Sequence, residues 1–271
     1  MPMSAEFNYV AKQPDAEGYI AYTDSEHLVW KTLYDRQIKA IQKRACDEYI
    51  NGLEMLNISS ELIPQCKTLS DRLKQLTGWS VVPVEALISF EKFFELLSNK
   101  CFPAASFIRV PEELDYLKEP DIFHEIFGHC PMLTNQAFAD FTQSIGCMGK
   151  QFSQTERVLL ARLYWFTVEF GLLNTTEGLR IYGGGILSSI GETQYALESD
   201  QPKRQPFDLL TVLRTPYRYD EMQLNYFVIN DFYDLYALAN AATLKKAFNE
   251  AIELGLLPNP HKKQNDETRS C

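Results

Sequence analysis

Over most of the chain, apolar residues recur at every third or fourth position, the spacing of one face of an α-helix. This pattern predicts one long helix from Ser25 to about Tyr49 and short helices at Ser89–Leu97 and Asn135–Met148. Another helix is expected to open near Pro64 and to end at Gly78, because proline suits the first helical turn and glycine suits the position after the last.

The remaining segments carry their own start and stop signals. Ser153-Gln-Thr-Glu156 is a capping box, in which a hydroxyl and a carboxylate satisfy each other's backbone N–H groups at the start of a helix. Asp231 is expected to cap a last long helix that runs to about Glu253. A short strand is expected at Phe102–Val110, and a strand followed by a turn is expected at Arg180–Ile186, with its glycines. The prediction is therefore an α+β fold that is mostly α with a few short β-strands.

The two ends of the chain lack this periodicity. Residues 1–22 are predicted to form an extended arm, residues 23–258 one domain, and the polar residues 259–271 a disordered tail. The 271 residues are enough for one large core, and neither an internal repeat nor a Gly/Ser linker divides them.

Charge and cysteine content limit which binding partners and which cellular compartment are expected. A net charge of −10 and a pI near 5.0 argue against binding to nucleic acid or to an anionic membrane, both of which require basic surfaces. The six cysteines are scattered without a CxxC pair, as expected for reduced thiols rather than a disulfide framework. The chain also shows neither a signal peptide nor a transmembrane run, so a cytoplasmic location is expected.

Two of the four histidines, His124 and His129, lie in one apolar stretch, where they form the pattern H-E-x-x-x-H. The zinc-protease motif is H-E-x-x-H, whose spacing of four places both rings on one helix face. A spacing of five sets them about 140° apart on a regular helix. Gly128 and Cys130-Pro131 indicate that the helix ends or distorts here, which would bring His129 back toward His124. The alternative is a pair of histidines hydrogen-bonded within the core.

Glu169 is the only charged residue between Tyr164 and Leu173. A carboxylate on such an apolar helix face is costly to bury unless it is paired or bound to a metal. The alternative is a position near the helix end, where the side chain reaches water. Two histidines and one carboxylate form the facial triad that leaves iron(II) positions open for O2 and substrate. His124, His129 and Glu169 are therefore the candidate metal ligands.

Three ordered motifs carry a resemblance to a known family. His124–His129 preceded by Glu119-Pro120-Asp121, then Tyr164–Leu172, then Tyr182–Glu192, closely resemble the aromatic amino acid hydroxylases, which are pterin-dependent, non-haem iron monooxygenases. The resemblance is strongest from Trp79 to Tyr195 and is greatest to the short bacterial members that hydroxylate phenylalanine.

The resemblance implies an activity and its cofactors. Residues 23–258 would be the catalytic domain, in which Fe(II), tetrahydrobiopterin or a related tetrahydropterin, and O2 as cosubstrate convert L-phenylalanine to L-tyrosine. Animal members carry a regulatory segment and a coiled-coil tail, and the last predicted helix here lacks sustained heptads. A monomer is therefore expected, with a dimer as the alternative.

The resemblance also implies which residues bind the substrate. Arg109 matches the arginine that holds the α-carboxylate of the amino acid, a task that suits a planar guanidinium. Without the family, Arg109 could equally be a surface arginine in a charged loop. Ser188 matches a serine that hydrogen-bonds near His124. The apolar walls around the substrate ring match Pro120, Trp165 and Phe170. Leu117 stands where many animal members carry a threonine near the amino-acid group of the substrate. Arg109 would therefore have fewer neighbouring side chains that help to bind this group.

For the pterin, the resemblance implies a separate set of residues. Phe93 matches the aromatic residue that stacks on the cofactor, although periodicity alone makes it a core residue. Glu125 matches a residue that contacts the pterin or an iron-bound water, and it is the candidate catalytic residue. The other matching positions around the pterin are Val84, Leu87, Ala161 and Tyr164.

Three other functions stay open at this point. Hydroxylation of tryptophan or tyrosine would need a differently shaped pocket, which the sequence does not display. A zinc hydrolase would use the same three ligands with Glu125 as general base, but the spacing of the histidines counts against it. A non-enzymatic binding protein with this fold is disfavoured because all three ligand types are present together.

Overall fold

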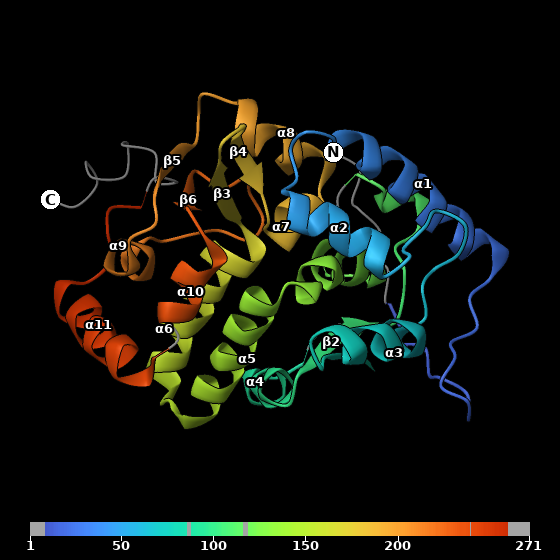
Figure 1. Cartoon of the computed structure of the whole chain (residues 1–271), viewed down its shortest axis with the longest axis horizontal. Helices are drawn as coiled ribbons and strands as arrows, with labels where there is room; N and C mark the ends of the chain where they lie inside the picture. Colours follow the sequence, from blue (N-terminus) through green and yellow to red (C-terminus); the bar gives the residue numbers. More distant parts are fainter. Residues whose placement is uncertain (1–8, 86–87, 116–118, 239, 260–271) are drawn as a thin grey trace, which may run out of the picture.

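The computed structural model describes residues 9–85, 88–115, 119–238 and 240–259, which form a mostly helical α+β fold (Figure 1). Its α-helices are α1 (Asp24–Ala40), α2 (Asp47–Met55), α3 (Cys66–Leu76), α4 (Phe90–Ser98), α5 (Gln136–Gln151), α6 (Gln154–Tyr164), α7 (Gly184–Leu187), α8 (Ile190–Glu198), α9 (Leu209–Arg214), α10 (Phe232–Leu238) and α11 (Ala241–Leu254). Its strands are β1 (Ser80–Val84), β2 (Cys101–Ala105), β3 (Gly171–Thr175), β4 (Gly178–Ile181), β5 (Lys203–Pro206) and β6 (Asn225–Ile229). The expected fold class is confirmed.

Four shorter helical segments lie between these elements. Two are 3-10 helices, η1 (Pro111–Glu113) and η3 (Cys130–Thr134), and two are π-helical turns, η2 (His124–His129) and η4 (Trp165–Glu169). The two π turns contain all three candidate metal ligands. Because π turns are frequently found at functional sites, these segments are the first place to look for chemistry.

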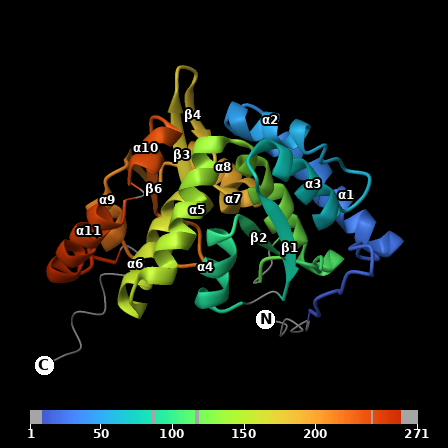
Figure 2. The same ribbon diagram turned by 60° about the horizontal axis from the view of Figure 1, so that its bottom comes forward.

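Helices surround a single core. Figures 1 and 2 show α1 to α3 on one side of the molecule and α9 to α11 on the other, with α5 and α6 between them. The buried side chains of these helices form one continuous hydrophobic cluster, which extends from Trp30 in α1 to Phe248 in α11. This cluster lies within the predicted domain of residues 23–258, whose boundaries stay a prediction.

The strands form two small sheets. One has the order β4-β3-β6-β5, in which β3 and β4 are antiparallel and the other two pairs are parallel. The second is a parallel pair, β1 and β2, in which Val82 lies opposite Pro103. Strand β3 begins at Gly171, two residues after Glu169. The larger sheet therefore fixes the chain immediately after one of the candidate ligands.

Several expected helix starts are confirmed by the caps. Ser89 caps α4 by accepting a hydrogen bond from the Lys92 N–H, and Asn135 caps α5 in the same way. Ser153 and Glu156 form the expected capping box of α6. Helix α3 begins two residues after Pro64, and Gly78 follows its end with a positive φ of 81°. A residue without a side chain tolerates that left-handed conformation at no steric cost.

The single long helix predicted from Ser25 to Tyr49 is wrong. Helix α1 ends at Ala40, and α2 begins only at Asp47. Between them the chain pairs with the end of β4, because the Cys46 N–H donates to the Ile181 carbonyl (2.9 Å) and the Ile181 N–H donates to the Arg44 carbonyl (2.7 Å). Tertiary pairing therefore interrupts a segment whose local pattern is helical throughout.

The last long helix, predicted from Asp231 to Glu253, is also two helices. Asp231 accepts a hydrogen bond from the Tyr233 N–H at the start of α10, but this helix ends at Leu238. Asn240 then caps α11, since its side chain accepts from the N–H groups of Ala242 and Thr243. An asparagine inside an apolar periodic stretch is a start signal, and here it prevails over the continuous pattern.

One expected strand is shorter than predicted. The strand at Phe102–Val110 ends at Ala105, because the backbone beyond it is bound by side chains rather than by a neighbouring strand. The segment Arg180–Ile186 begins in strand β4 (Gly178–Ile181), as expected, and its glycines open the one-turn helix α7 where a turn was expected.

Residues 9–22 form neither helix nor strand, and the extended arm over residues 1–22 stays a prediction. The predictions for residues 1–8 and 260–271 lie outside the described residues. Across the described ranges, no helix is both long enough and apolar enough to cross a membrane.

Candidate active site

The five-residue spacing of the histidines is explained by the π turn. In η2, from His124 to His129, backbone hydrogen bonds join residues five apart, so a spacing of five returns to nearly the same face. The expected distortion of the helix is therefore confirmed, and it takes the form of a π turn. A second π turn, η4, places Glu169, and its last hydrogen bond runs from the Phe170 N–H to the Trp165 carbonyl (2.9 Å).

The three candidate ligands converge on one point. His124 Nε2 lies 3.1 Å from His129 Nε2, and Glu169 Oε2 lies 3.7 Å and 3.2 Å from these two atoms respectively. Ligands about 2.1 Å from one ion at right angles stand about 3.0 Å apart. The spacing therefore suits three neighbouring positions on one face of a metal ion. Among the described residues, this is the only group of three ligating side chains so arranged.

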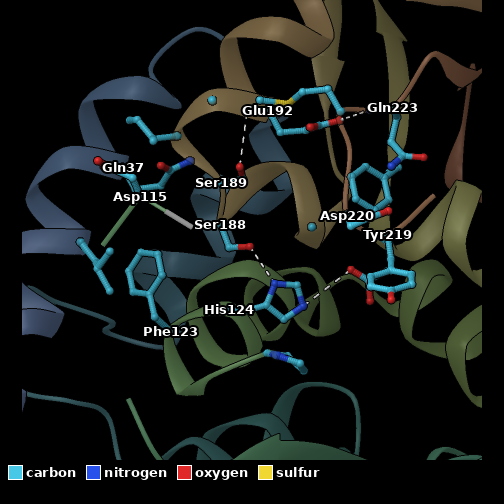
Figure 3. Close-up of a pocket in the computed structure, with 18 of the residues that line it drawn as sticks. Gln37, Asp115, Phe123, His124, Ser188, Ser189, Glu192, Tyr219, Asp220 and Gln223 are labelled. Atoms are coloured by element: carbon cyan, nitrogen blue, oxygen red, sulfur yellow. Dashed lines mark hydrogen bonds and ion pairs between the residues drawn. The ribbon is translucent and has the colours of Figure 1, made fainter. Parts of the chain in front are cut away.

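The ring of His124 is held in one tautomer. Ser188 Oγ donates to the Gly184 carbonyl at 2.9 Å, so its single proton is used there. It must then accept from His124 Nδ1–H, which lies 2.9 Å away, and Figure 3 shows the two groups pointing toward one another. This leaves the lone pair of Nε2 free for a metal. Burial lowers the pKa of His124 to about 4, which keeps the ring neutral at physiological pH.

The glycines after β4 allow α7 to lie directly against the ligands. A Cβ atom at Gly184 would stand 2.4 Å from His129 Nδ1, so any side chain there would displace the ring. Burial by itself lowers the pKa of His129, but the charge and hydrogen bond of Glu169 outweigh burial and raise it. The same pair holds the pKa of Glu169 below its ordinary value despite its burial. Without metal, the two side chains form an ion pair, and both offer the atoms that a metal would bind.

A cavity of about 690 Å³ opens on one side of these ligands. His124, Ser188 and Phe123 line it, together with the segment that carries Tyr219 and Asp220 (Figure 3). Its lining also includes all five predicted substrate residues, which are Arg109, Pro120, Trp165, Phe170 and Ser188. The structure thus brings these positions together with two of the candidate ligands, His124 and Glu169. The third, His129, lies buried behind them.

Arg109 is held at the cavity by a buried partner, Asp121. Arg109 Nε and Nη2 donate to the two carboxylate oxygens at 2.8 and 2.9 Å, and the Arg109 backbone N–H donates to Oδ2 at 3.0 Å. Asp121 is fully buried and also accepts from the His124 N–H at 3.1 Å. One carboxylate therefore fixes the arginine relative to His124, the first candidate metal ligand. The Nη1 side of the guanidinium is the part that Asp121 does not use.

The aromatic wall of the cavity is fixed by a polar network. The ring of Trp165 lies 4.6 Å from that of Phe170, and its Nε1–H donates to Gln223 Oε1 (3.1 Å). The Gln223 N–H in turn donates to the buried carboxylate of Glu192 at 3.1 Å, as Figure 3 shows. Tyr226 also donates its hydroxyl proton to Glu192. These contacts set the angle of the Trp165 ring in the cavity.

The predicted pterin residues that the structure describes lie apart from the lining of this cavity. Phe93 in α4 packs edge-on against Tyr164 in α6, with ring centroids 5.3 Å apart. Glu125 is half-buried on η2 and lies within electrostatic reach of Tyr164. Burial raises the pKa of Glu125 to about 8. Val84 ends β1, and Ala161 lies on α6.

Two predicted positions lie outside the described residues, Leu87 and Leu117. Their expected roles near the pterin and near the substrate stay predictions.

Comparison with known proteins identifies the family. The family model "Biopterin-dependent aromatic amino acid hydroxylase" matches residues 3–253 of the chain. The chain belongs to this family. A phenylalanine-4-hydroxylase from Pseudomonas aeruginosa is 55% identical over 248 residues, which cover 92% of this chain and 94% of that protein.

Solved structures of other hydroxylases share the fold. The apo structure of the cold active phenylalanine hydroxylase from Colwellia psychrerythraea 34H has a TM-score of 0.90 and 52% sequence identity, and the match covers 93% of this chain and 97% of that one. Phenylalanine hydroxylase from Chromobacterium violaceum, solved with bound iron(III) and oxidized 7,8-dihydrobiopterin, has a TM-score of 0.85 at 40% identity. That match covers 93% of each chain.

Sequence reasoning assigned no role to several residues that build this hydroxylase site. Asp121 and Glu192 lie inside the motifs that carry the family resemblance, but only the structure shows that they hold Arg109 and Gln223. For Asp121, the signal available in the sequence was an acidic residue next to the metal motif. Gln223 lies 54 residues after Glu169 without any motif around it, so only folding reveals its contact with Trp165.

Proposed function

We propose that this chain hydroxylates L-phenylalanine to L-tyrosine, using O2 and a tetrahydropterin at a mononuclear iron(II) held by His124, His129 and Glu169. It is a phenylalanine 4-monooxygenase of the aromatic amino acid hydroxylase family. The observation that carries the proposal is the convergence of two histidines and one carboxylate beside an aromatic cavity. Two histidines and one carboxylate leave half of an octahedral metal open to other ligands.

The ligand set fits iron(II) on the chemistry of its donors. Both rings present Nε2, and the hydrogen bond from His124 Nδ1–H to Ser188 fixes one of them in the tautomer that binds a metal. When bound, iron(II) and tetrahydropterin together supply the electrons that activate O2. The protein's share is to hold the open metal face toward the cavity and to keep the surrounding walls apolar.

The cavity orients an aromatic amino acid. Trp165, Phe170 and Pro120 offer the surfaces against which the ring of the substrate packs. Arg109 Nη1, which Asp121 does not use, is the donor that we assign to the α-carboxylate. Holding the substrate at both ends places its ring beside His124 and Glu169, and such orientation lowers the entropic part of the barrier.

For the pterin we propose the side of the metal on which Phe93, Glu125 and Tyr164 lie, with Val84 and Ala161 as further contacts. The support is the edge-on packing of Phe93 against Tyr164, which leaves a face of an aromatic ring to stack on a planar cofactor. Glu125 is half-buried and has a raised pKa, so it suits a hydrogen bond to the pterin or to a metal-bound water.

Phe93→Ala is expected to raise the KM for tetrahydropterin by about five- to tenfold, because stacking on an aromatic face contributes on the order of 1 kcal/mol. Iron content and the KM for phenylalanine should change little. Steady-state kinetics with the pterin varied, together with iron analysis, measures this. Phe90→Ala is the matched control, since Phe90 is an exposed phenylalanine on the same helix. A folded Phe93→Ala variant with an unchanged pterin KM would return Phe93 to the core.

The experiment that tests the function is anaerobic loading with iron(II), followed by turnover with O2 and a tetrahydropterin. Phenylalanine, tryptophan and tyrosine are supplied separately, and the hydroxylated products are quantified. Phenylalanine is expected to give the highest kcat/KM. Activity that is independent of O2 and is supported by zinc would instead indicate a hydrolase.

We also propose that the protein is a cytoplasmic monomer. The support is the set of five free cysteines in the described ranges, which suits a reducing compartment, and the absence of sustained heptads in the last helix. Sedimentation equilibrium of the whole chain at micromolar concentration tests the monomer, and a mass near 62 kDa, about twice the 31.2 kDa of one chain, would contradict it.

A further inference from the structure

We propose that the N-terminal arm, residues 9–22, supports the substrate site from outside the cavity, and that Tyr9 is a positioning residue for the carboxylate-binding Arg109. This inference rests on the role proposed above for Arg109. Tyr9 does not line the cavity and acts through the segment that carries the arginine, residues 106–110.

The segment of residues 106–110 depends on other parts of the chain for its hydrogen bonds. It follows β2 and forms neither helix nor strand. Two of its bonds go to the chain just before the metal motif: the Arg109 N–H donates to Asp121 Oδ2 at 3.0 Å, and the Phe107 carbonyl accepts from the Ile122 N–H at 2.8 Å. Since buried backbone groups must be paired, its remaining partners matter for its position.

The remaining partners are two tyrosines of the arm and the Glu113 N–H, which donates to the Val110 carbonyl at 3.0 Å. The Val110 N–H donates to the hydroxyl of Tyr9 at 3.1 Å, and the Ser106 carbonyl accepts from the hydroxyl of Tyr22 at 3.0 Å. The arm therefore holds the segment at both ends, with Arg109 between the two contacts. The segment pairs with no described strand, and a helix holds only its last residue, Val110, which is the N-cap of η1.

Tyr9 makes the more extensive of the two contacts. Its ring stacks on that of Phe107, with centroids 4.3 Å apart and planes inclined by 15°. Its hydroxyl accepts from the Val110 N–H and donates to the carboxylate of Glu113 in η1. Burial and this carboxylate raise the pKa of Tyr9 to about 12, so the hydroxyl keeps the proton that it donates. One side chain thus joins residues 107, 110 and 113, which flank Arg109 on both sides.

The arrangement complements Asp121. Asp121 binds the arginine head and its backbone N–H from one side, but it does not hold the chain that follows Arg109. A two-pronged contact with a carboxylate is sensitive to displacement, because both hydrogen bonds need near-linear geometry. Without the Tyr9 hydroxyl, the Val110 N–H loses its partner, and the Val110 end of the segment keeps only the hydrogen bond from the Glu113 N–H to the Val110 carbonyl (3.0 Å). This weaker support lets Nη1 shift relative to the substrate.

The test compares Tyr9→Phe with the wild type in the iron-loaded enzyme. This substitution keeps the stacked ring and removes only the hydroxyl. The KM for phenylalanine is expected to rise by about three- to tenfold, the range for losing the net contribution of one or two hydrogen bonds. The KM for tetrahydropterin, the iron content and the kcat should stay within about twofold, a margin of a few tenths of a kcal/mol. Tyr19→Phe is the matched control, because Tyr19 is an exposed tyrosine of the same arm.

Two further measurements show whether Tyr9 acts through Arg109. In an Arg109→Ala background, adding Tyr9→Phe should cause no further loss in kcat/KM for phenylalanine. Phenethylamine, which lacks the carboxylate, should be equally poor for the wild type and for Tyr9→Phe. If Tyr9→Phe lowers kcat/KM equally in both backgrounds, or raises the two KM values together, the arm is only structural and the inference is overturned.

The design separates this inference from the role of Arg109. If Arg109→Ala lowers kcat/KM equally for phenylalanine and for phenethylamine, the role proposed for Arg109 is wrong, and the inference about Tyr9 is then wrong as well. If Arg109→Ala lowers kcat/KM for phenylalanine but not for phenethylamine, Arg109 keeps its proposed role. If Tyr9→Phe then behaves like the wild type, only the inference about Tyr9 is wrong.

Discussion

Replacing His124, His129 or Glu169 with alanine is expected to abolish stoichiometric iron binding and phenylalanine hydroxylation. The three atoms that would bind the metal lie 3.1 to 3.7 Å apart, and the described residues offer no fourth ligating side chain beside them. Two ligands from the protein leave the ion with too few bonds to compete with water. The loss should therefore be nearly complete rather than graded.

The thermal stability of the three variants should also show the loss of iron binding. A metal present at about 100 times its dissociation constant stabilises the folded state by about 2.7 kcal/mol. Thermal unfolding of the wild type with and without iron(II) should show this difference, and the three variants should show none. Metal analysis after removal of unbound iron gives the stoichiometry directly.

His27→Ala is the matched control for these variants. His27 lies outside the site, and its Nδ1 accepts a hydrogen bond from the Ile63 N–H at 3.1 Å. This variant should keep one iron per chain even if its stability falls. Full iron content and wild-type turnover in all three ligand variants would show that the metal is bound elsewhere.

Arg109→Ala is expected to lower kcat/KM for phenylalanine by about a hundredfold or more while iron binding is retained. Truncating one side of a desolvated charge pair costs roughly 2–5 kcal/mol, and each 1.4 kcal/mol is a factor of ten. Arg109→Lys keeps the charge but loses the planar fork, so it should not behave as a conservative change. Phenethylamine should be a poor substrate for the wild type and should be hardly affected by either substitution.

The ion pair between Arg109 and Asp121 adds a condition to the Arg109→Ala experiment. Arg109→Ala leaves a fully buried carboxylate without its cation, which destabilises a protein by roughly 3–5 kcal/mol. Kinetics must therefore be measured at a temperature at which the variant is folded, as judged by circular dichroism. Arg36→Ala is the matched control, because Arg36 lines the same cavity but pairs with the exposed Asp115. Equal slowing of phenylalanine and phenethylamine by Arg109→Ala would make the arginine structural.

The sequence was sufficient to predict the fold class and the chemistry. Apolar periodicity indicated a mostly helical domain, and the caps at Ser89, Asn135 and Ser153 began helices where expected. Such signals are local, because a cap satisfies N–H groups within three residues of itself. The motif around His124 and the lone acid at Glu169 were likewise readable, since rare polar residues stand out in an apolar stretch.

Tertiary structure decided what depends on contacts between distant segments. The helix predicted beyond Ala40 is interrupted because Arg44 and Cys46 pair with Ile181, which lies about 140 residues away in the chain. The same holds for Tyr9, whose partner Val110 is 101 residues away, and for Gln223 beside Trp165. Such long-range hydrogen bonds pair backbone and side-chain groups that have no partner nearby in the sequence, and the hydrophobic periodicity does not predict them.

The metal site needed both kinds of information. The sequence by itself predicted the three candidate ligands and their order, and the five-residue spacing argued against a regular helical site. Only the folded chain shows that π turns at His124–His129 and Trp165–Glu169 turn the three side chains toward one point. A π turn inserts one residue into a helix at a local cost, and the packing of α7 and β3 against these turns holds them in place. The residue types were therefore set locally, and their convergence was set by packing.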